Sequence, residues 1–224
     1  MKVRPSSGRV LLCLLLCSVG SKAALSLPNL QSVVLAIDQH HDRLHTMQAD
    51  FTEIYQGAGV ERTESGTMWL KKTGKMRWEY RSPEEKLFIC DGKDAWFYLP
   101  AEKQVRKSSL RSLEDLRSPL AFLLGKAKLE KELGRLSFAP DMQVWQPGDS
   151  MLRGIPRGME DRISQVLLEI TPEYRISRIL IHGVDDSVTE YRFSNFKEDL
   201  AIPDGRFHFV APAGTETVDE KNGE

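Results

Sequence analysis

Residues 66–100 read GTMWLKKTGKMRWEYRSPEEKLFICDGKDAWFYLP and carry the clearest structural signal in the chain. In this stretch the apolar residues Met76, Trp78 and Tyr80 alternate with charged ones, which is the two-residue period of a strand with one dry face. Asp91-Gly92 separates two further apolar runs and predicts a tight hairpin, because both residues tolerate positive φ. Strands that follow each other so closely must pair antiparallel.

The same reasoning extends along the chain. We expect strands at residues 47–56, 61–72, 75–81, 86–91, 94–100, 103–108, 135–139, 142–146, 150–155, 162–171, 175–183 and 188–198, with a last one near 207–209. Asn29 is a good N-cap for an amphipathic helix over 29–45. Ser118-Pro119 predicts the start of a short apolar helix, and a second helical piece follows at 126–133. The polar tail, 215–224, is expected to fray.

These elements predict a mainly β protein with about a dozen strands and few helices. A meandering sheet of that length should curl. We therefore expect an incomplete antiparallel β-barrel, or a strongly curled sheet, with a lid of about three α-helices over its concave apolar face. Residues 24–214 would form a single domain. An apolar cavity under the lid would accept a hydrophobic ligand, whereas a filled core without a cavity is the alternative that the pattern leaves open.

The N-terminus has the pattern of a secretory signal peptide. Three basic residues precede the apolar stretch 10–17, and the small residues Ser21 and Ala23 precede an expected cut before Ala24. We therefore set residues 1–23 aside. Four of the 31 basic residues and none of the 32 acidic ones lie there, which leaves a formal charge of −5. Nucleic acid and anionic membranes reward clustered positive charge, so both are poor candidate partners.

The usual catalytic constellations are missing. The sequence has no metalloprotease, serine-hydrolase, dinucleotide-binding or P-loop motif. His41 and His45 are four residues apart and could share a metal, but no cysteine or carboxylate motif completes the site. His182 and His208 read as strand-edge residues, and the acidic pairs at 84–85 and 185–186 read as solvated. We predict no enzymatic activity, no cofactor and no metal.

One cysteine, Cys90, remains after the signal peptide, so no intramolecular disulfide is possible. Its neighbours Leu87, Phe88 and Ile89 are apolar. A buried structural thiol is therefore expected, because free cysteine packs as a small hydrophobe.

Several stretches together carry a family resemblance. They are residues 66–72, 75–80, 88–93 and 95–100, supported by Met47-Gln48-Ala49-Asp50-Phe51, Ser118-Pro119-Leu120, Phe207-His208-Phe209 and Pro212-Ala213-Gly214. Over nearly the whole chain after the signal peptide, the sequence resembles the LolA family of periplasmic lipoprotein carriers. The resemblance implies an incomplete β-barrel with a helical lid and a monomeric, non-enzymatic protein of the periplasm. Such a protein accepts acylated lipoproteins from an inner-membrane ABC transporter and passes them to an outer-membrane acceptor lipoprotein.

The resemblance also implies which residues form the site. Candidates for the acyl-chain cavity and lid are Met47, Phe51, Trp69, Met76, Trp78, Phe88, Phe97, Leu120 and Phe122. Each of them taken singly is equally consistent with ordinary core packing. Met47, Met68 and Met76 would suit variable ligands, because the unbranched thioether adapts its shape.

Lys72 stands where the family has an arginine that ties the barrel to backbone carbonyls of the lid. Lysine lacks the planar fork of arginine, so lid closure is expected to be weaker or differently organised.

Other functions stay open at this stage. A periplasmic protein of the same fold could bind or sense a different amphiphile, because a fold alone does not set function. A lipid hydrolase would need a nucleophile with a base beside it. A structural envelope protein would have a dry core and no ligand.

Overall fold

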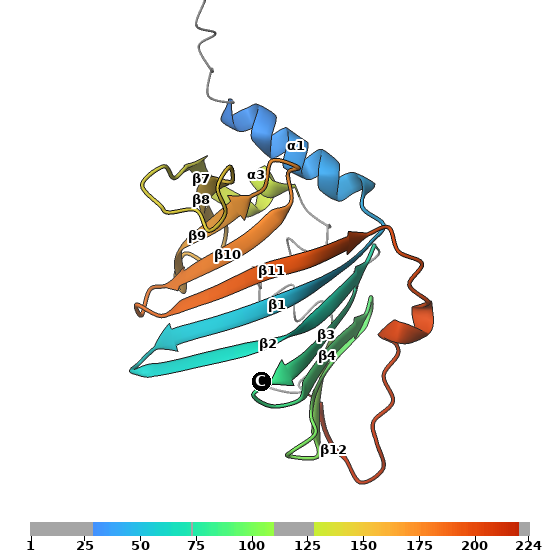
Figure 1. The fold of residues 1–224 in the computed structure, drawn as a ribbon. Helices are drawn as coiled ribbons and strands as arrows, with labels where there is room; N and C mark the ends of the chain where they lie inside the picture. The colour runs from blue at the N-terminus through green and yellow to red at the C-terminus, as the bar shows by residue number, and fades with distance from the viewer. Residues whose placement is uncertain (1–28, 73, 110–127, 220–224) are drawn as a thin grey trace, which may run out of the picture.

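The computed structural model describes residues 29–72, 74–109 and 128–219. Their strands are β1 Thr46–Gly57, β2 Val60–Lys71, β3 Lys75–Ser82, β4 Lys86–Asp91, β5 Asp94–Leu99, β6 Gln104–Ser109, β7 Leu133–Phe138, β8 Ser150–Pro156, β9 Ile163–Ile170, β10 Ile176–Gly183, β11 Val188–Glu198 and β12 Glu216–Asp219. They form one twelve-stranded sheet in the order β12-β6-β5-β4-β3-β2-β1-β11-β10-β9-β8-β7 (Figure 1). The predicted mainly β class and the number of strands are confirmed.

The helices are few in the part of the chain that the structure describes. They are α1 Leu30–Arg43, α3 Leu129–Glu132 and the 3-10 turn η2 Asp204–Phe207. Asn29 caps α1 as predicted, because its side chain accepts the N–H of Gln31 at 3.1 Å. Two α-helices rather than about three are therefore seen in these ranges, and the helix expected from Ser118 lies outside them. No helix among the described residues is long and apolar enough to cross a membrane.

Most predicted strands are confirmed to within two residues, and three expectations are wrong. Residues 142–146 form a loop and not a strand. Phe207 is the last residue of η2, and residues 208–209 after it are irregular, so the last predicted strand is not formed. Residues 216–219 do not fray, because β12 pairs with β6. That pairing is parallel, whereas all the other pairings in the sheet are antiparallel. The expected signal peptide and residues 220–224 lie outside the described ranges.

The sheet is strongly curled. Two strands, β2 and β1, lie between β3 and β11, and neighbouring strands are about 4.8 Å apart. Nevertheless the ring of Trp78 on β3 lies 6.0 Å from the ring of Tyr191 on β11 and 6.1 Å from the ring of Phe193. These contacts require the face that carries Trp78 to be concave. We call it the inner face, and the opposite one the outer face.

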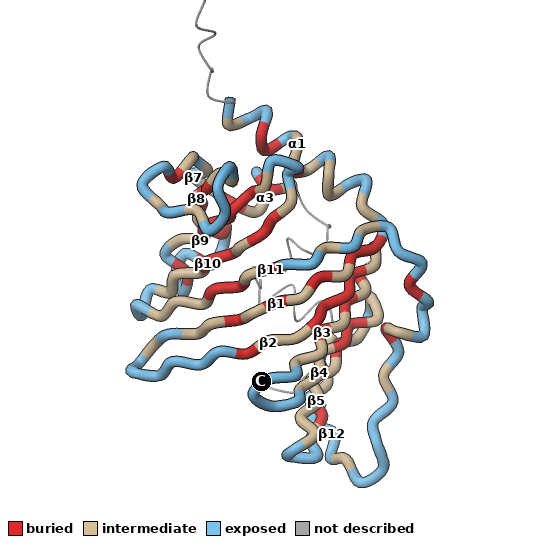
Figure 2. Tube along the Cα trace, viewed as in Figure 1, coloured by how far each residue is buried: buried red, intermediate tan, exposed pale blue. Residues whose placement is uncertain are grey.

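The main hydrophobic core covers the inner face. It joins alternate residues of β1 to β5 and β8 to β11 with Val33, Val34 and Ile37 of α1. In Figure 2 the buried residues accordingly recur along these strands and on one side of α1. Helix α1 therefore packs on the inner side of the sheet, as expected for a cover.

The outer face is covered at two places. Ile202 and Phe207, from the segment after β11, pack on Trp69. The loop between β7 and β8 covers a second cluster that includes Leu167 and Leu180. Strands β2, β9 and β10 therefore have buried residues on both faces.

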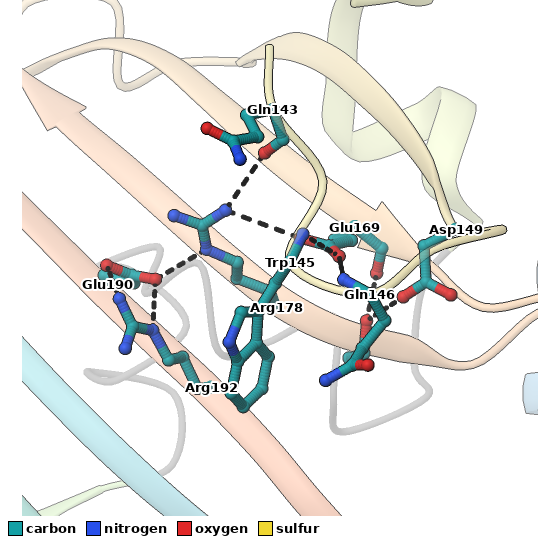
Figure 3. Close-up of polar contacts among 9 residues, drawn as sticks. Gln143, Trp145, Gln146, Asp149, Glu169, Arg178, Glu190 and Arg192 are labelled. Carbon is teal, nitrogen blue, oxygen red and sulfur yellow. Dashed lines mark hydrogen bonds and ion pairs between the residues drawn. The ribbon is translucent and has the colours of Figure 1, made fainter.

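A network of charges fixes the β7–β8 loop (Figure 3). Glu169 is completely buried, and its Oε1 accepts the backbone N–H groups of Trp145 at 2.6 Å and Gln146 at 3.0 Å. Its Oε2 lies 3.4 Å from Nη1 of Arg178, which also donates through Nε to Glu190 at 2.5 Å. Burial of Glu190 opposes its ionisation, but the donors that surround it hold the pKa of this carboxyl below its usual value.

Candidate functional site

The inner face brings together most of the residues predicted for the acyl-chain site. Met47, Phe51, Met76 and Trp78 are buried in the inner cluster, and Phe88 packs against it. Phe97 stands directly opposite Phe88 in the β4–β5 ladder, so the two side chains share one face. Leu120 and Phe122 lie outside the described residues.

Trp69 is the exception. It is 6% exposed and packs with Ile202 and Phe207 on the outer face, while its neighbours Met68 and Leu70 belong to the inner cluster. Successive residues of a strand point to opposite faces, so Trp69 cannot line the inner face. Its indole N–H donates to Oε1 of Gln48 at 3.0 Å. The prediction that Trp69 lines the cavity is therefore wrong.

Aromatic rings and methionines dominate the centre of the inner face. Phe51 makes edge contacts with Trp78 at 4.7 Å and Tyr80 at 4.9 Å between ring centroids. Met68 is fully buried beside them. Cys90 is 1% exposed in the same cluster, which confirms the expected buried thiol.

The inner face becomes polar towards the β1–β2 hairpin. Residues in direct register on β1, β2 and β3 form successive rows across the face. From the apolar end to the polar end, the rows are Met47, Leu70 and Met76; then Ala49, Met68 and Trp78; then Phe51, Gly66 and Tyr80; and last Glu53 and Glu64. Residues in direct register share a face, so this series follows one surface from apolar to charged. The inner face therefore changes from apolar to polar along its length, as an amphiphilic molecule does.

Glu53 is the central group of the polar end. It is 9% exposed, and its Oε2 accepts the hydroxyl of Tyr80 at 2.9 Å. Burial raises the pKa of Glu53. The hydrogen bond from Tyr80 lowers this pKa, and the neighbouring charge of Glu64 raises it further. Burial beside Glu53 also raises the pKa values of Tyr80 and Tyr191. Glu64 is paired with Lys86 and lies 3.3 Å from Arg62.

Replacing Glu53 by glutamine is expected to stabilise the protein at about pH 8 and to leave it unchanged at about pH 4. A carboxyl whose pKa is raised on folding contributes its full stability below its ordinary value of 4.5. That contribution is lost as the pH rises through the raised value, because the ionised form is buried. Melting temperatures over this range measure the effect, with exposed Glu61→Gln as the control. A Glu53→Gln variant that is less stable than wild type at pH 8 would contradict it.

The C-terminal end of α1 is tied to both the sheet and α3. The Lys72 ammonium donates to the backbone carbonyl of Asp42 in the last turn of α1. The Lys128 ammonium pairs with the carboxylate of Asp42, and this hydrogen bond lowers the pKa of that carboxyl. Asp38 accepts the backbone N–H of Leu129, at the start of α3, at 3.0 Å. Lys72 thus contacts a helix carbonyl, which is the type of group that the family resemblance assigns to its arginine.

A second tie joins α1 to the end of β11. Nε2 of His40 lies 3.1 Å from Oε1 of Glu198, which also accepts Nε of Arg175 at 2.6 Å. Burial opposes ionisation of Glu198, but Arg175 and His40 hold its pKa below the usual value. Separating α1 from the sheet would therefore break the contact between His40 and Glu198.

The structure places no metal-ligand cluster of three or more His, Cys, Asp or Glu residues within 29–72, 74–109 and 128–219. His45 lies beyond the end of α1 and contacts Asp199 at 3.5 Å, so it does not share a helix face with His41. His182 does lie on a strand, β10. The acidic pairs at 84–85 and 185–186 are exposed, as predicted.

Sequence reasoning missed the contribution of β11 and of Glu53. Tyr191 and Phe193 stack beside Trp78, although they are more than 100 positions away in the chain. The alternation of Tyr191 and Phe193 within a predicted strand was the available signal. Nothing local indicated that β11 pairs with β1.

Comparison with known proteins places this architecture in a family. Residues 42–210 match the model of the family described as outer membrane lipoprotein carrier protein LolA. A relative from Nitrosospira multiformis, named outer-membrane lipoprotein carrier protein, is 28% identical over 183 residues, which cover 80% of this chain and 84% of the relative. A protein of the same name from Nitrosomonas europaea is 25% identical over 209 residues, covering 92% and 98% of the two chains.

A solved structure supports the fold independently. An uncharacterized conserved protein from Thermus thermophilus superposes with a TM-score of 0.55 at 14% identity, covering 84% of this chain and 98% of its own. At that identity the likeness concerns the fold alone. The family match spans the sheet from the end of α1 to the segment after η2. The chain therefore belongs to the LolA family of outer membrane lipoprotein carrier proteins.

Proposed function

We propose that this protein carries acylated lipoproteins across the periplasm by holding their acyl chains against the inner face of its curled sheet. It would receive them from an inner-membrane ABC transporter and deliver them to an outer-membrane acceptor lipoprotein. The observation that carries the proposal is the continuous apolar inner face with Phe51, Trp78 and Met68 at its centre. The names of the relatives and the family match support the same role.

The energetics of acyl chains suit this surface. Burying one methylene group is worth about 0.8 kcal/mol, so a carrier needs apolar area more than many polar contacts. Methionine side chains adapt to chains of different length. Phe51, Met68 and Trp78 are almost completely buried, so acyl chains can reach them only when the segments that cover the inner face move. The ties of α1 to Lys72 and Glu198 would then resist opening.

Mass spectrometry of the mature protein isolated from the periplasm of its host tests the proposal, in the native state and after lipid extraction. Acylated lipoproteins at about one per protein are expected. Free phospholipid or another amphiphile in their place would favour the second candidate, a lipid-binding or lipid-sensing protein of the same fold. Protein that carries no amphiphile under any growth condition would overturn both.

Lys72→Leu is expected to release bound lipoprotein about two- to fivefold faster than wild type, because it removes a charged hydrogen bond to α1 of roughly 0.5–1 kcal/mol at an exposed site. Lys72→Arg keeps a donor at this position and should release at or below the wild-type rate. A transfer assay from loaded protein to acceptor membranes measures both. Lys93→Leu, at an exposed position in the β4–β5 turn, is the matched control. Equal transfer by wild type and both Lys72 variants would remove any gating role for this side chain.

A further inference from the structure

One hydrogen-bond donor on the inner face, the indole N–H of Trp78, is buried without a partner in the described part of the chain. Trp78 itself is 1% exposed. Buried polar groups in native proteins are nearly always paired, and a buried donor left alone costs free energy. The other tryptophan of this region, Trp69 on the outer face, has its indole N–H paired with Gln48.

The chemistry of a ligand group that could pair with this N–H follows from the donor. An indole N–H only donates, so the partner must be an acceptor such as a carbonyl oxygen. The surroundings of Trp78 are apolar: rings of Phe51, Tyr191 and Phe193 lie within 4.7–6.1 Å of its ring. An acceptor that reaches this place must therefore arrive attached to an apolar group. An acyl chain has this composition, with hydrocarbon on one side of a carbonyl.

The position of Trp78 along the inner face supports the same ligand. Met76, two residues before it, belongs to the apolar end, and Tyr80, two residues after it, donates to Glu53 at the polar end. Glu64, directly opposite Glu53 in the β1–β2 ladder, and its partner Lys86 belong to the same polar end. Trp78 thus lies between the apolar end and the polar end of the inner face, one row of paired residues before Tyr80. In an acylated ligand the ester or amide linkage likewise lies between the hydrocarbon and the polar group.

We propose that the Trp78 indole N–H binds the carbonyl oxygen of a bound acyl chain, so that the inner face recognises the ester or amide linkage as well as the hydrocarbon. This inference rests on the proposed function and adds to it that the protein recognises the ester or amide carbonyl of the ligand. Lipids with ester-linked chains should bind better than lipids whose chains of equal length are ether-linked. The acylated cysteine of a lipoprotein and a phospholipid both contain such a carbonyl group.

The test compares ester and ether forms of two probes. One is a lipopeptide with an S-dipalmitoylglyceryl or an S-dihexadecylglyceryl cysteine, and the other is dipalmitoyl or dihexadecyl phosphatidylglycerol. Wild-type protein should bind the ester form about three- to tenfold more tightly, the range expected for one buried neutral hydrogen bond. Trp78→Phe removes the donor and should bind both forms equally. Trp69→Phe, which alters an indole already paired on the outer face, should keep the wild-type preference.

The outcomes distinguish failure of the Trp78 inference from failure of the carrier proposal. A preference confined to the lipopeptide assigns the linkage site to lipoprotein cargo, and one shared by both probes assigns it to acyl esters in general. Equal binding of ester and ether forms by wild type overturns the Trp78 inference and leaves acyl-chain carriage standing. Failure of wild type to bind any of the four probes overturns the carrier proposal itself.

A second measurement uses only wild-type protein, so it does not depend on whether the Trp78→Phe variant folds. In wild-type protein the Trp78 indole N–H resonance should move downfield when the ester lipid binds and stay in place with the ether lipid. An unchanged resonance with bound ester lipid would also refute the inference.

Discussion

Gly66→Ala is expected to lower the free energy of unfolding by about 3 kcal/mol or more, because the β2–β3 ladder leaves no room for a side chain at this position. A Cβ built on Gly66 would lie 1.9 Å from the backbone carbonyl oxygen of Glu79 and 2.9 Å from Cε1 of Phe51. The first contact is with backbone of the neighbouring strand, so the strands themselves must shift. The ladder is already irregular between Ser65 and Gly66.

The inner face explains why the chain keeps a glycine here. Gly66 lies between Phe51 on β1 and Tyr80 on β3 in the paired register. Without a side chain between them, the two rings approach to 4.9 Å across β2. Alanine would separate the rings and disturb the hydrogen bond from Tyr80 to Glu53.

Thermal or chemical unfolding measures the loss, with a melting temperature lowered by roughly 6–12 °C for a chain of this size. Gly205→Ala is the matched control, because a Cβ at Gly205 meets no atom within 4 Å. Its stability should stay within about 0.5 kcal/mol of wild type. Equal stability of the two variants would show that the sheet absorbs the clash.

Glu169→Ala is expected to cost about 3–5 kcal/mol, because it removes one partner from a buried set of charges. Two backbone N–H groups, of Trp145 and Gln146, would lose their acceptor. Arg178 would lose one of its two carboxylate partners. The β7–β8 loop should then detach from the outer face, and the network in Figure 3 should open at its buried end.

Two comparisons isolate the cause. Glu169→Gln keeps an acceptor oxygen for the two N–H groups but loses the charge and the oxygen that accepts from Arg178. Its cost should therefore be smaller, about 1–2 kcal/mol. Glu173→Ala removes an exposed carboxylate 3.7 Å from Arg175 and should be nearly neutral. Urea unfolding gives the stabilities, and amide hydrogen exchange of Trp145 and Gln146 reports the loop. Full amide protection in the alanine variant would falsify this role of Glu169.

Local sequence predicted the strands well because each carries its own period. Met76, Trp78 and Tyr80 alternate with polar residues and were correctly assigned to one face. Asp91 and Gly92 form the predicted hairpin: Gly92 has φ of +99°, and Asp91 accepts the backbone N–H groups of Lys93 and Asp94. Both signals act over a few residues, so no tertiary information is needed to read them.

The wrong predictions occur where tertiary contacts override local composition. The tail residues 216–219 are exposed and, apart from Val218, polar, yet they pair with β6 because that strand offers an unpaired edge. The stretch 142–146 has apolar residues like a strand, but Glu169 accepts the backbone N–H groups of Trp145 and Gln146 and holds this end of the stretch as a loop. Neither Glu169 nor the edge of β6 can be recognised from the segment itself.

By itself, the sequence determined that this is a meandering β protein of the LolA pattern and which residues of β3 share a face. Only the tertiary structure decided that Trp78 faces inward and Trp69 outward. Met68, Trp69 and Leu70 are consecutive and all buried, so alternation cannot say which face of β2 is the inner one. That choice depends on Ile202 and Phe207, which cover Trp69 from more than 130 positions away, and on Tyr191, which meets Trp78 because the sheet curls.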